Sequence, residues 1–217
     1  MIKRGFTLAE VLITLGIIGV IAAITIPNVI NKVNMKHYET MFKKQYSNIQ
    51  NALNYILIDE NVSNCYVAFP EGTVGGYITK GSDCSALNQL LTEKLNLEKA
   101  AYKASELYAS KSTVLNNGGQ AINKNFNYDN WIYYSTGYIT KDGCLIFLYS
   151  YIVIIDVNGE KGPNKWGYDV FYMHFSKISG RLLLTDNLAS LIEKGGRFPR
   201  SILQNSDKNT DTSWRRL

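Results

Sequence analysis

The chain has 217 residues and a formal net charge of +5, from 23 Lys and Arg against 18 Asp and Glu. Charged residues make up 19% and hydrophobic residues 46% of the sequence, a balance that argues against an intrinsically disordered chain. The small positive surplus argues against a dedicated nucleic-acid-binding protein. Two His and three Cys leave few side chains for a transition-metal centre or a histidine-based active site.

The first predicted element is an apolar helix over residues 6–26, with Glu10 as its one charge. At 1.5 Å per residue it would be about 30 Å long, the thickness of a bilayer hydrocarbon core. A cleaved secretory signal has a shorter apolar run followed by a small-residue cleavage site. This run ends instead in Thr25-Ile26-Pro27-Asn28, so the pattern favours a membrane-spanning helix.

Glu10 does not fit a plain membrane anchor. A carboxylate inside an apolar helix costs on the order of 3 kcal/mol unless a partner neutralises it, and such residues are functional by default. No basic residue lies one helical turn away inside the span, and the nearest cations are Lys3 and Arg4. The sequence therefore predicts that Glu10 has a functional partner.

Residues 3–12, which read Lys-Arg-Gly-Phe-Thr-Leu-Ala-Glu-Val-Leu, closely resemble the class III signal of type IV pilins and type II secretion pseudopilins. The resemblance implies that a prepilin peptidase removes residues 1–5 by cutting between Gly5 and Phe6. Phe6 would then be N-methylated and would become the first mature residue. Glu10 takes the position of the family's glutamate, which is proposed to pair with the terminal amine of Phe6 on a neighbouring subunit.

The resemblance implies a structural subunit, the precursor of a pilin or pseudopilin, and not an enzyme. Its partners would be the prepilin peptidase, other subunits in a homo- or heteropolymer, and the inner-membrane assembly machinery. The subunit would be a single-pass protein of the inner (cytoplasmic) membrane, with its head outside the cytoplasm, before it enters a filament. The alternative is a membrane-tethered binding module, for a ligand or for DNA uptake, that does not polymerise.

The basic residues conflict with this orientation. Lys and Arg are enriched on the cytoplasmic side of membrane helices. Here Lys3 and Arg4 precede the span, whereas a larger number of lysines follow it, namely Lys32, Lys36, Lys43 and Lys44. We let the processing motif override this count, because cleavage after Gly5 requires a cytoplasmic leader.

A second, amphipathic helical half is predicted over residues 27–58. Pro27 should end or kink the apolar segment, because it lacks an N–H and clashes with the preceding turn. Apolar residues then recur at helical spacing as Ile30, Val33, Tyr38, Met41, Phe42, Tyr46, Ile49, Leu53, Ile56 and Leu57. In the resembled family this half packs against the globular head.

Residues 59–198 are predicted to form an α+β head in which the long helix packs on a small antiparallel sheet. A helix is expected over residues 85–107. Strands are expected over residues 131–140, 144–155 (either one strand or two, broken near Ser150), 168–175 and 181–185. The turns Asp142-Gly143 and 156–164, with Gly167 to Phe171, also resemble heads of bacterial pilin-like proteins. Residues 199–217 should be a polar tail.

Cys65 and Cys84 bracket a loop-like segment, and a disulfide between them would close it. Cys144 would then be left over. Spacing alone cannot fix the pairing, and the alternative is three reduced, buried cysteines that act as small apolar residues.

Oxygen ligands near Asp156 and Asn158 suggest a structural Ca²⁺ site, with Glu160 and Asp169 nearby. The glycine position is not that of an EF-hand, and the sequence favours a turn in which Asp156 and Asn158 bond their own backbone. No other cofactor is expected. Nucleic-acid contact would fall to the tyrosines and to a weak basic stretch, Arg197, Arg200, Arg215 and Arg216, but the modest charge argues against it.

Overall fold

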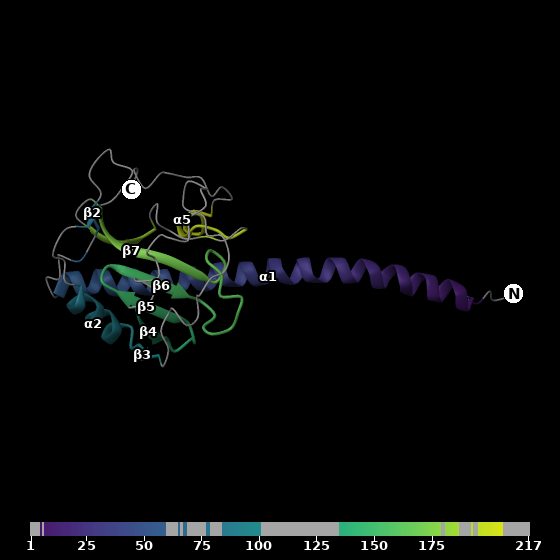
Figure 1. The fold of residues 1–217 in the computed structure, drawn as a ribbon, viewed down its shortest axis with the longest axis horizontal. Helices are drawn as coiled ribbons and strands as arrows, with labels where there is room; N and C mark the ends of the chain where they lie inside the picture. Colours follow the sequence, from purple (N-terminus) through teal and green to yellow (C-terminus); the bar gives the residue numbers. More distant parts are fainter. Residues whose placement is uncertain are drawn as a thin grey trace, which may run out of the picture. The chain divides into compact units, whose positions relative to one another are not determined.

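The computed structural model describes residues 5, 7–59, 65, 67–68, 77–78, 84–100, 135–178, 181–186, 192 and 195–205. The expected leader residues 1–4, Phe6, most of the loop at 61–81, the segment 101–134 and the tail beyond 205 lie outside the described residues. The helices are α1 (Leu8–Asp59), α2 (Ser85–Lys94) and α5 (Pro199–Leu203). The strands are β1 (Val67–Ala68), β2 (Tyr77–Ile78), β3 (Glu98–Lys99), β4 (Thr136–Ile139), β5 (Leu145–Tyr149), β6 (Ile152–Asp156), β7 (Val170–Ile178) and β8 (Arg181–Thr185) (Figure 1).

The fold is α+β, as expected, with a long apolar N-terminal helix and an antiparallel sheet. The chain divides into two compact units, Met1–His37 and Tyr38–Leu217, and α1 contributes to both. Pro27 lies inside α1 and does not end it, so of the two expected outcomes, an end or a kink, the structure excludes the end. A proline in a helix removes one backbone hydrogen bond, and the bonds on either side continue the helix. The division between units falls ten residues after Pro27.

In the second unit, α1 buries one face against the sheet. Phe42, Ile49, Leu53 and Ile56 are at most 1% exposed, and their spacing of seven, four and three residues is that of one helix face. They share a hydrophobic core with Leu87 and Leu91 of α2 and with one face of the sheet, formed by Ile146, Leu148, Val153, Ile155, Phe171, Met173 and Phe175. The amphipathic half therefore packs on the head within this unit.

The sheet has the strand order β2-β1-β7-β6-β5-β4-β3, with β8 also paired to β7. Strands β3 to β8 pair antiparallel, and β1 runs parallel to β7. The other sides of these strands form a second buried cluster, Leu145, Phe147, Ile152, Ile154, Val170 and Tyr172 with Trp166. Because side chains alternate along a strand, burial of both faces explains the continuous apolar run at 144–155.

That run forms two strands, β5 and β6, rather than one. Tyr149 pairs with Ile152 across a two-residue turn, and Ser150 adopts a φ of 50°. The helix expected over residues 85–107 ends much earlier, at Lys94. Asn96 has a φ of 50° just beyond it, and this left-handed conformation, which Asn tolerates, ends helices.

Two turns of the head meet at Gly159. Its φ is 70°, and a Cβ there would lie 2.6 Å from the carbonyl oxygen of Gly143. Only glycine allows both the conformation and the approach. The turn at 140–143 and the turn after β6 are therefore held against each other, which places the two segments of the second resemblance side by side.

The expected polar tail is wrong for its first residues. Pro199–Leu203 form α5, and Pro199, Arg200, Ser201 and Ile202 are buried. The backbone N–H of Arg197 donates to the carbonyl oxygen of Gly167 at 2.8 Å, and the Arg197 guanidinium pairs with Glu39 of α1. These contacts outweigh the polar composition, because the burial of Ile202 and the pairing of Arg197 with Glu39 stabilise the segment.

Candidate functional site

The scissile bond implied by the motif follows Gly5, which is exposed and lies before the helix. A Cβ at Gly5 would meet no atom of the described residues within 4 Å. Phe6 lies outside the described residues, Thr7 is exposed, and α1 begins at Leu8. The described residues on either side of the expected bond, Gly5 and Thr7, are therefore exposed and non-helical.

Glu10 lies in the first turn of α1 and bonds back to Thr7. Its Oε2 atom accepts the Thr7 backbone N–H at 2.8 Å and the Thr7 hydroxyl at 2.9 Å. The Thr7 hydroxyl in turn accepts the Glu10 backbone N–H at 3.2 Å. This reciprocal pair is a capping box, the T-x-x-E pattern that satisfies the first N–H groups of a helix.

The sequence interpretation missed Thr7. The T-x-x-E spacing at 7–10 is the local sequence signal for this cap. The cap turns the Glu10 carboxylate toward Thr7, just before the start of the helix. It also leaves the second carboxylate oxygen, Oε1, without a hydrogen bond among the described residues.

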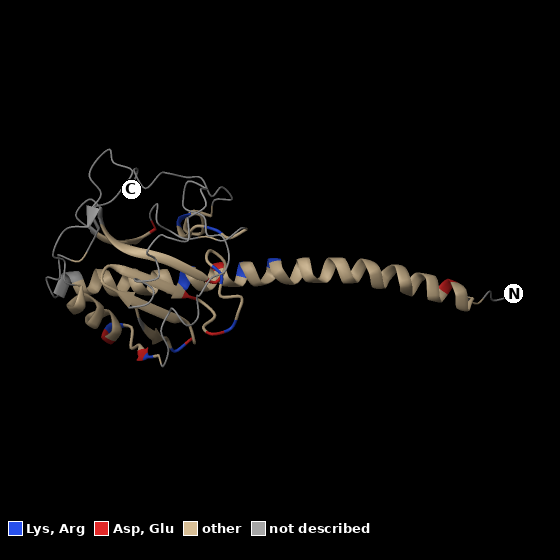
Figure 2. Ribbon diagram, in the orientation of Figure 1, with Lys and Arg blue, Asp and Glu red and all other residues tan. Residues whose placement is uncertain are grey.

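The first unit exposes its apolar surface. Large hydrophobic residues of α1 from Leu8 to Val33 are 42–78% exposed. This is the one helix in the described chain long and apolar enough, by length and composition, to cross a membrane. Figure 2 shows the run from Glu10 to the lysines without a charged residue. Such a surface is stable only against lipid or other apolar helices.

Polar side chains inside the apolar segment are bonded locally. The Thr14 hydroxyl donates to the Val11 carbonyl at 3.0 Å, and the Thr25 hydroxyl donates to the Ile21 carbonyl at 2.9 Å. Hydrogen bonds of this kind remove the penalty for an unsatisfied hydroxyl in an apolar environment. The segment is therefore compatible with a hydrocarbon surrounding along its length.

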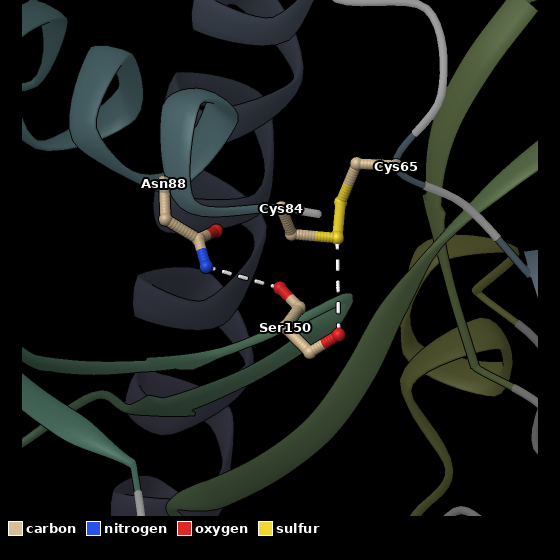
Figure 3. The surroundings of a disulfide bond; sticks show 4 residues. All are labelled: Cys65, Cys84, Asn88 and Ser150. Atoms are coloured by element: carbon tan, nitrogen blue, oxygen red, sulfur yellow. Dashed lines mark hydrogen bonds between the residues drawn. A yellow bond between two sulfur atoms is a disulfide. The ribbon is translucent and has the colours of Figure 1, made fainter. Parts of the chain in front are cut away.

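Cys65 and Cys84 form a disulfide with a Cα–Cα distance of 5.0 Å, the pairing predicted from the sequence (Figure 3). The Ser150 hydroxyl lies 3.9 Å from the Cys84 sulfur, and the Asn88 amide donates to the Ser150 carbonyl at 3.0 Å. The bridge therefore ties residue 65 to the start of α2, and the Asn88 hydrogen bond ties α2 to the turn between β5 and β6.

Cys144 is the free cysteine, and it is buried. Its thiol donates to the Val157 carbonyl at 3.1 Å and accepts from the Gln45 amide at 3.3 Å. Burial raises the pKa of the Cys144 thiol, which keeps it protonated and unreactive. The arrangement has the character of a structural cysteine.

The turn after β6 is held by its own backbone. Asp156 accepts the Asn158 backbone N–H at 3.1 Å, which is the Asx-type turn that the sequence favoured. Asp169 accepts the backbone N–H groups of Asn164 at 2.9 Å and Lys165 at 2.8 Å. Burial is the largest effect on Asp169 and raises the pKa of its carboxyl.

These residues fit a Ca²⁺ site poorly. Both buried carboxylates already accept backbone N–H groups, and Glu160 is exposed. The Oδ1 atoms of Asn158 and Asn164 are buried without a donor, and they are the feature that would suit a cation. No group of three or more His, Cys, Asp or Glu side chains among the described residues could hold a metal ion.

His174 and the described arginines of the basic stretch make contacts within the head. His174 is fully buried, and its Nε2 atom lies 3.3 Å from the Thr185 hydroxyl, which pairs with Ser176 at 2.7 Å. Burial lowers the pKa of His174 to about 3. Of the four arginines considered for nucleic acid, Arg200 is buried 3.9 Å from the Asp186 carboxylate, Arg197 pairs with Glu39, and Arg215 and Arg216 lie outside the described residues.

Residues 1–26 match the family model for the prokaryotic N-terminal methylation motif. This motif is the signature of the prepilin-type signal, and its match covers the expected leader, the expected cleavage position, the capping box and most of the exposed apolar segment. Neither a curated protein nor a solved structure matches the chain significantly.

Proposed function

We propose that the chain is the precursor of a filament subunit, a pilin or pseudopilin of a type IV pilus or a type II secretion-type filament. The observation that carries the proposal is the methylation motif at residues 1–26, which contains most of the exposed apolar part of α1. A prepilin peptidase cleaves after Gly5 on the cytoplasmic side, and the new terminal residue, Phe6, is N-methylated.

The apolar surface of α1 serves two states of the subunit in turn. Before assembly it lies in the inner membrane, and in the filament it packs against the helices of neighbouring subunits. Both environments remove the same side chains from water, at about 25 cal/mol per Å² of apolar surface. Moving α1 from the membrane into the filament therefore changes its free energy little, and the inner-membrane assembly machinery can drive this step.

Glu10 fixes the axial position of one subunit's helix relative to that of its neighbour. A carboxylate in an apolar surrounding is costly unless it is paired. The capping box holds Oε2 at the start of the helix and leaves Oε1 for a second partner. That partner is the positively charged amine of Phe6 on an adjacent subunit.

The head lies outside the cytoplasm. The Cys65–Cys84 disulfide supports this side, because disulfides persist in oxidising compartments and are rare in the cytosol. The protein acts as a structural subunit, not as an enzyme.

The second candidate is a membrane-tethered head that binds a ligand or DNA without polymerising. It needs neither cleavage at Gly5 nor a free amine at Phe6. The contacts of Arg197 and Arg200 with Glu39 and Asp186 reduce the charge available for DNA, and this favours the filament subunit.

The test is incorporation into filaments. The chain is produced in cells with the matching assembly machinery, once with an active and once with an inactive prepilin peptidase, and filaments are sheared and purified. We expect the subunit in the filament fraction only when the peptidase is active. A cleaved chain that stays entirely in the membrane fraction would contradict the proposal and favour the tethered head.

A further inference from the structure

Strand β8 forms an edge of the sheet, because β7 is its one partner among the strands that the structure describes. His174 of β7 pairs with Ile152 of β6 and also with Thr185 of β8, so β6 and β8 flank β7 on opposite sides. The other side of β8 faces away from the sheet. Such an edge presents backbone N–H and C=O groups to which another chain can add a strand.

The outward backbone groups of β8 are bonded to a side chain of α1. The Gln50 amide nitrogen donates to the carbonyl oxygen of Leu182 at 3.1 Å, and the Gln50 amide oxygen accepts the backbone N–H of Leu184 at 3.0 Å. Leu182 and Leu184 are two residues apart, so both turn their backbone groups to the same side of β8. Because that side meets a helix side chain, it is the side away from β7. The Gln50 carboxamide therefore takes the place of a peptide group in a neighbouring strand.

Gln50 is held at this edge by its surroundings. Its amide nitrogen also donates to Oδ1 of Asn54, one turn further along α1, at 3.2 Å. The side chains of Leu182 and Leu184 are 4% and 0% exposed and belong to the core that α1 shares with the sheet. The contact between Gln50 and β8 is therefore anchored in the packing of the head.

Without this contact, β8 would be a favourable site for strand addition. Residues 181–185 read Arg-Leu-Leu-Leu-Thr, with no acidic residue and no proline, and the Leu183 side chain is partly exposed. Charged side chains, prolines and bulges are the usual features that keep an edge strand from pairing with another chain. In β8 the one charge, Arg181, lies at the end of the strand, so Gln50 supplies the protection in the middle.

Strand β8 is also complementary to itself. In an antiparallel pair of two copies centred on Leu183, Leu182 of one copy faces Leu184 of the other. The groups that would bond across this pair include the Leu182 carbonyl and the Leu184 N–H, which are the two groups that the α1 carboxamide occupies. Arg181 would face Thr185, so no like charges oppose each other. The carboxamide and a second copy therefore compete for one site.

We propose that Gln50 closes the β8 edge of the head against a second copy of this chain, and that a two-fold β8 pair centred on Leu183 forms once the Gln50 amide is removed. An isologous contact of this kind joins two copies and no more. In a filament subunit, the closed edge keeps the head from joining another head outside the contacts of the filament. That role rests on the proposed function, whereas the closure of the edge does not.

Self-association of the full chain in detergent micelles tests the proposal, since micelles leave each copy free to turn over, as the two-fold pairing requires. The variant is Gln50→Ala. The matched control is Gln89→Ala, which makes the same change at an exposed position of α2. Both keep the apolar segment of α1, so a difference between them does not come from that segment. Sedimentation gives the dissociation constant of the dimer.

We expect the dissociation constant of Gln50→Ala to be about tenfold or more below that of the wild type, because the pair gains backbone hydrogen bonds between the two copies. Gln89→Ala should stay within about twofold of the wild type. An unchanged dissociation constant in Gln50→Ala overturns the proposal.

Leu183→Lys, added to Gln50→Ala, tests the register of the pair. The two substituted side chains would face each other across the two-fold axis, where like charges destabilise a pair of strands. The dissociation constant should return to within about twofold of the wild type. A double variant that associates as tightly as Gln50→Ala would place the contact elsewhere and overturn the proposal.

Hydrogen exchange separates opening of the edge from loss of the fold. In monomeric Gln50→Ala the Leu184 amide should exchange about tenfold or more faster than in the wild type. The Phe175 amide, which donates to the Tyr151 carbonyl on the other side of β7 at 2.9 Å, should be unchanged. Unchanged exchange at Leu184 overturns the proposal.

Equal acceleration at Leu184 and Phe175 would mean that the alanine variant has lost its fold. Gln50→Met, which keeps the length of the side chain and removes the amide, then replaces it, with the same expected results and the same contradicting ones. None of these measurements depends on cleavage after Gly5, so their outcome is distinguishable from that of the filament proposal.

Discussion

The Glu10 carboxylate accepts the backbone N–H of Thr7 at 2.8 Å, and both hydrogen bonds from Thr7 reach the same oxygen, Oε2. Cleavage after Gly5 would place a charged amine on Phe6, one residue before Thr7. The carboxylate is thus already turned toward the end of the chain where positive charge would appear. Its other oxygen, Oε1, accepts no hydrogen bond from the part of the chain that the structure describes.

Glu10 therefore has two roles, as a helix cap and as a negative charge, and an alanine substitution would remove both at once. In Glu10→Gln the amide oxygen can still cap the helix, whereas the charge is lost. We expect both Glu10→Gln and Glu10→Ala to insert into the membrane and to be cleaved normally. Their incorporation into filaments should fall about tenfold or more, because a charge-assisted contact contributes roughly 1.5–3 kcal/mol.

Thr7→Val is the control for the cap. It removes the hydroxyl contacts and keeps the charge, at a cost of about 1 kcal/mol in helix capping. Its incorporation should fall less than about fivefold. Filament yields of Glu10→Gln equal to the wild type would rule out the charge pairing and leave the cap as the role of Glu10.

The disulfide should contribute strongly to the stability of the head. Cys65 and Cys84 are 19 residues apart, and closing a loop of this size stabilises the native state by about 3 kcal/mol. Urea unfolding of the oxidised chain should show this loss on addition of dithiothreitol. The Cys65→Ser, Cys84→Ser double variant should be insensitive to dithiothreitol. If dithiothreitol lowers the free energy of unfolding of the double variant by the same amount, the loss does not come from this disulfide.

Two ion pairs of the head should differ in their contribution. Asp186 accepts the backbone N–H of Arg200 at 3.2 Å, and both side chains are buried. Asp186→Ala leaves a buried guanidinium without this carboxylate, and we expect a loss of about 3 kcal/mol or more in the free energy of unfolding.

The exposed pair Lys44–Asp142 is the comparison. The hydrogen bond from Lys44 lowers the pKa of Asp142, and the same bond raises the pKa of Lys44. Both groups are solvent-exposed, where screening by water leaves an ion pair with little net effect on stability, so Asp142→Ala should lower the free energy of unfolding much less than Asp186→Ala does. Urea unfolding of the two variants, measured together, checks the ranking. A larger loss for Asp142→Ala would contradict it.

His174 should make the head less stable in acid. Burial lowers the pKa of His174 to about 3 from its ordinary 6.5. Between about pH 6.5 and pH 3, His174 therefore binds a proton in the unfolded chain but not in the native chain. Stability from this group is complete above pH 6.5 and falls by up to about 1.4 kcal/mol per pH unit as pH decreases toward 3.

The measurement is the free energy of unfolding of the wild type and of His174→Gln between pH 7 and pH 4. Asp169, whose pKa burial raises, contributes with the opposite sign. It is present in both chains, so the difference between them isolates His174. This difference should shrink as pH falls, and a difference independent of pH would contradict the assignment.

Calcium should have no effect on the head. The carboxylates of Asp156 and Asp169 already accept backbone N–H groups. We expect the melting temperature in millimolar Ca²⁺ and in excess chelator to agree within about 1 °C, because a ligand stabilises only the state that binds it. A rise of several degrees with Ca²⁺, lost in Asn158→Ala, would show that the unpaired amide oxygens bind the ion.

The fold was predictable where the local pattern and the tertiary packing agree. The apolar spacing from Phe42 to Ile56 marks the buried face of α1, and the Asp-Gly turn at 142–143 precedes β5. The sequence left the run at 144–155 undecided, because a strand buried on both faces has no alternation. The positive φ of Ser150 that divides it has no local signal in a serine.

Tertiary contacts decided the elements that were mispredicted. The segment at Pro199–Leu203 has a polar composition, but Asp186 and Glu39 supply partners for its neighbouring arginines that are distant in sequence. In the candidate site, Gly5 and Glu10 were recognisable from the motif. The hydrogen bonds between Thr7 and Glu10 were not predicted, although the spacing of the two residues is a local signal for a capping box.

The most direct test of the account is the mass of the N-terminal peptide from the membrane-extracted protein, produced in cells with an active prepilin peptidase. The account predicts a peptide that begins at Phe6 and carries one additional methyl group. A peptide that begins at Met1 in those cells would contradict it. The chain would then be an anchored head domain, and Glu10 would have only its intrachain cap.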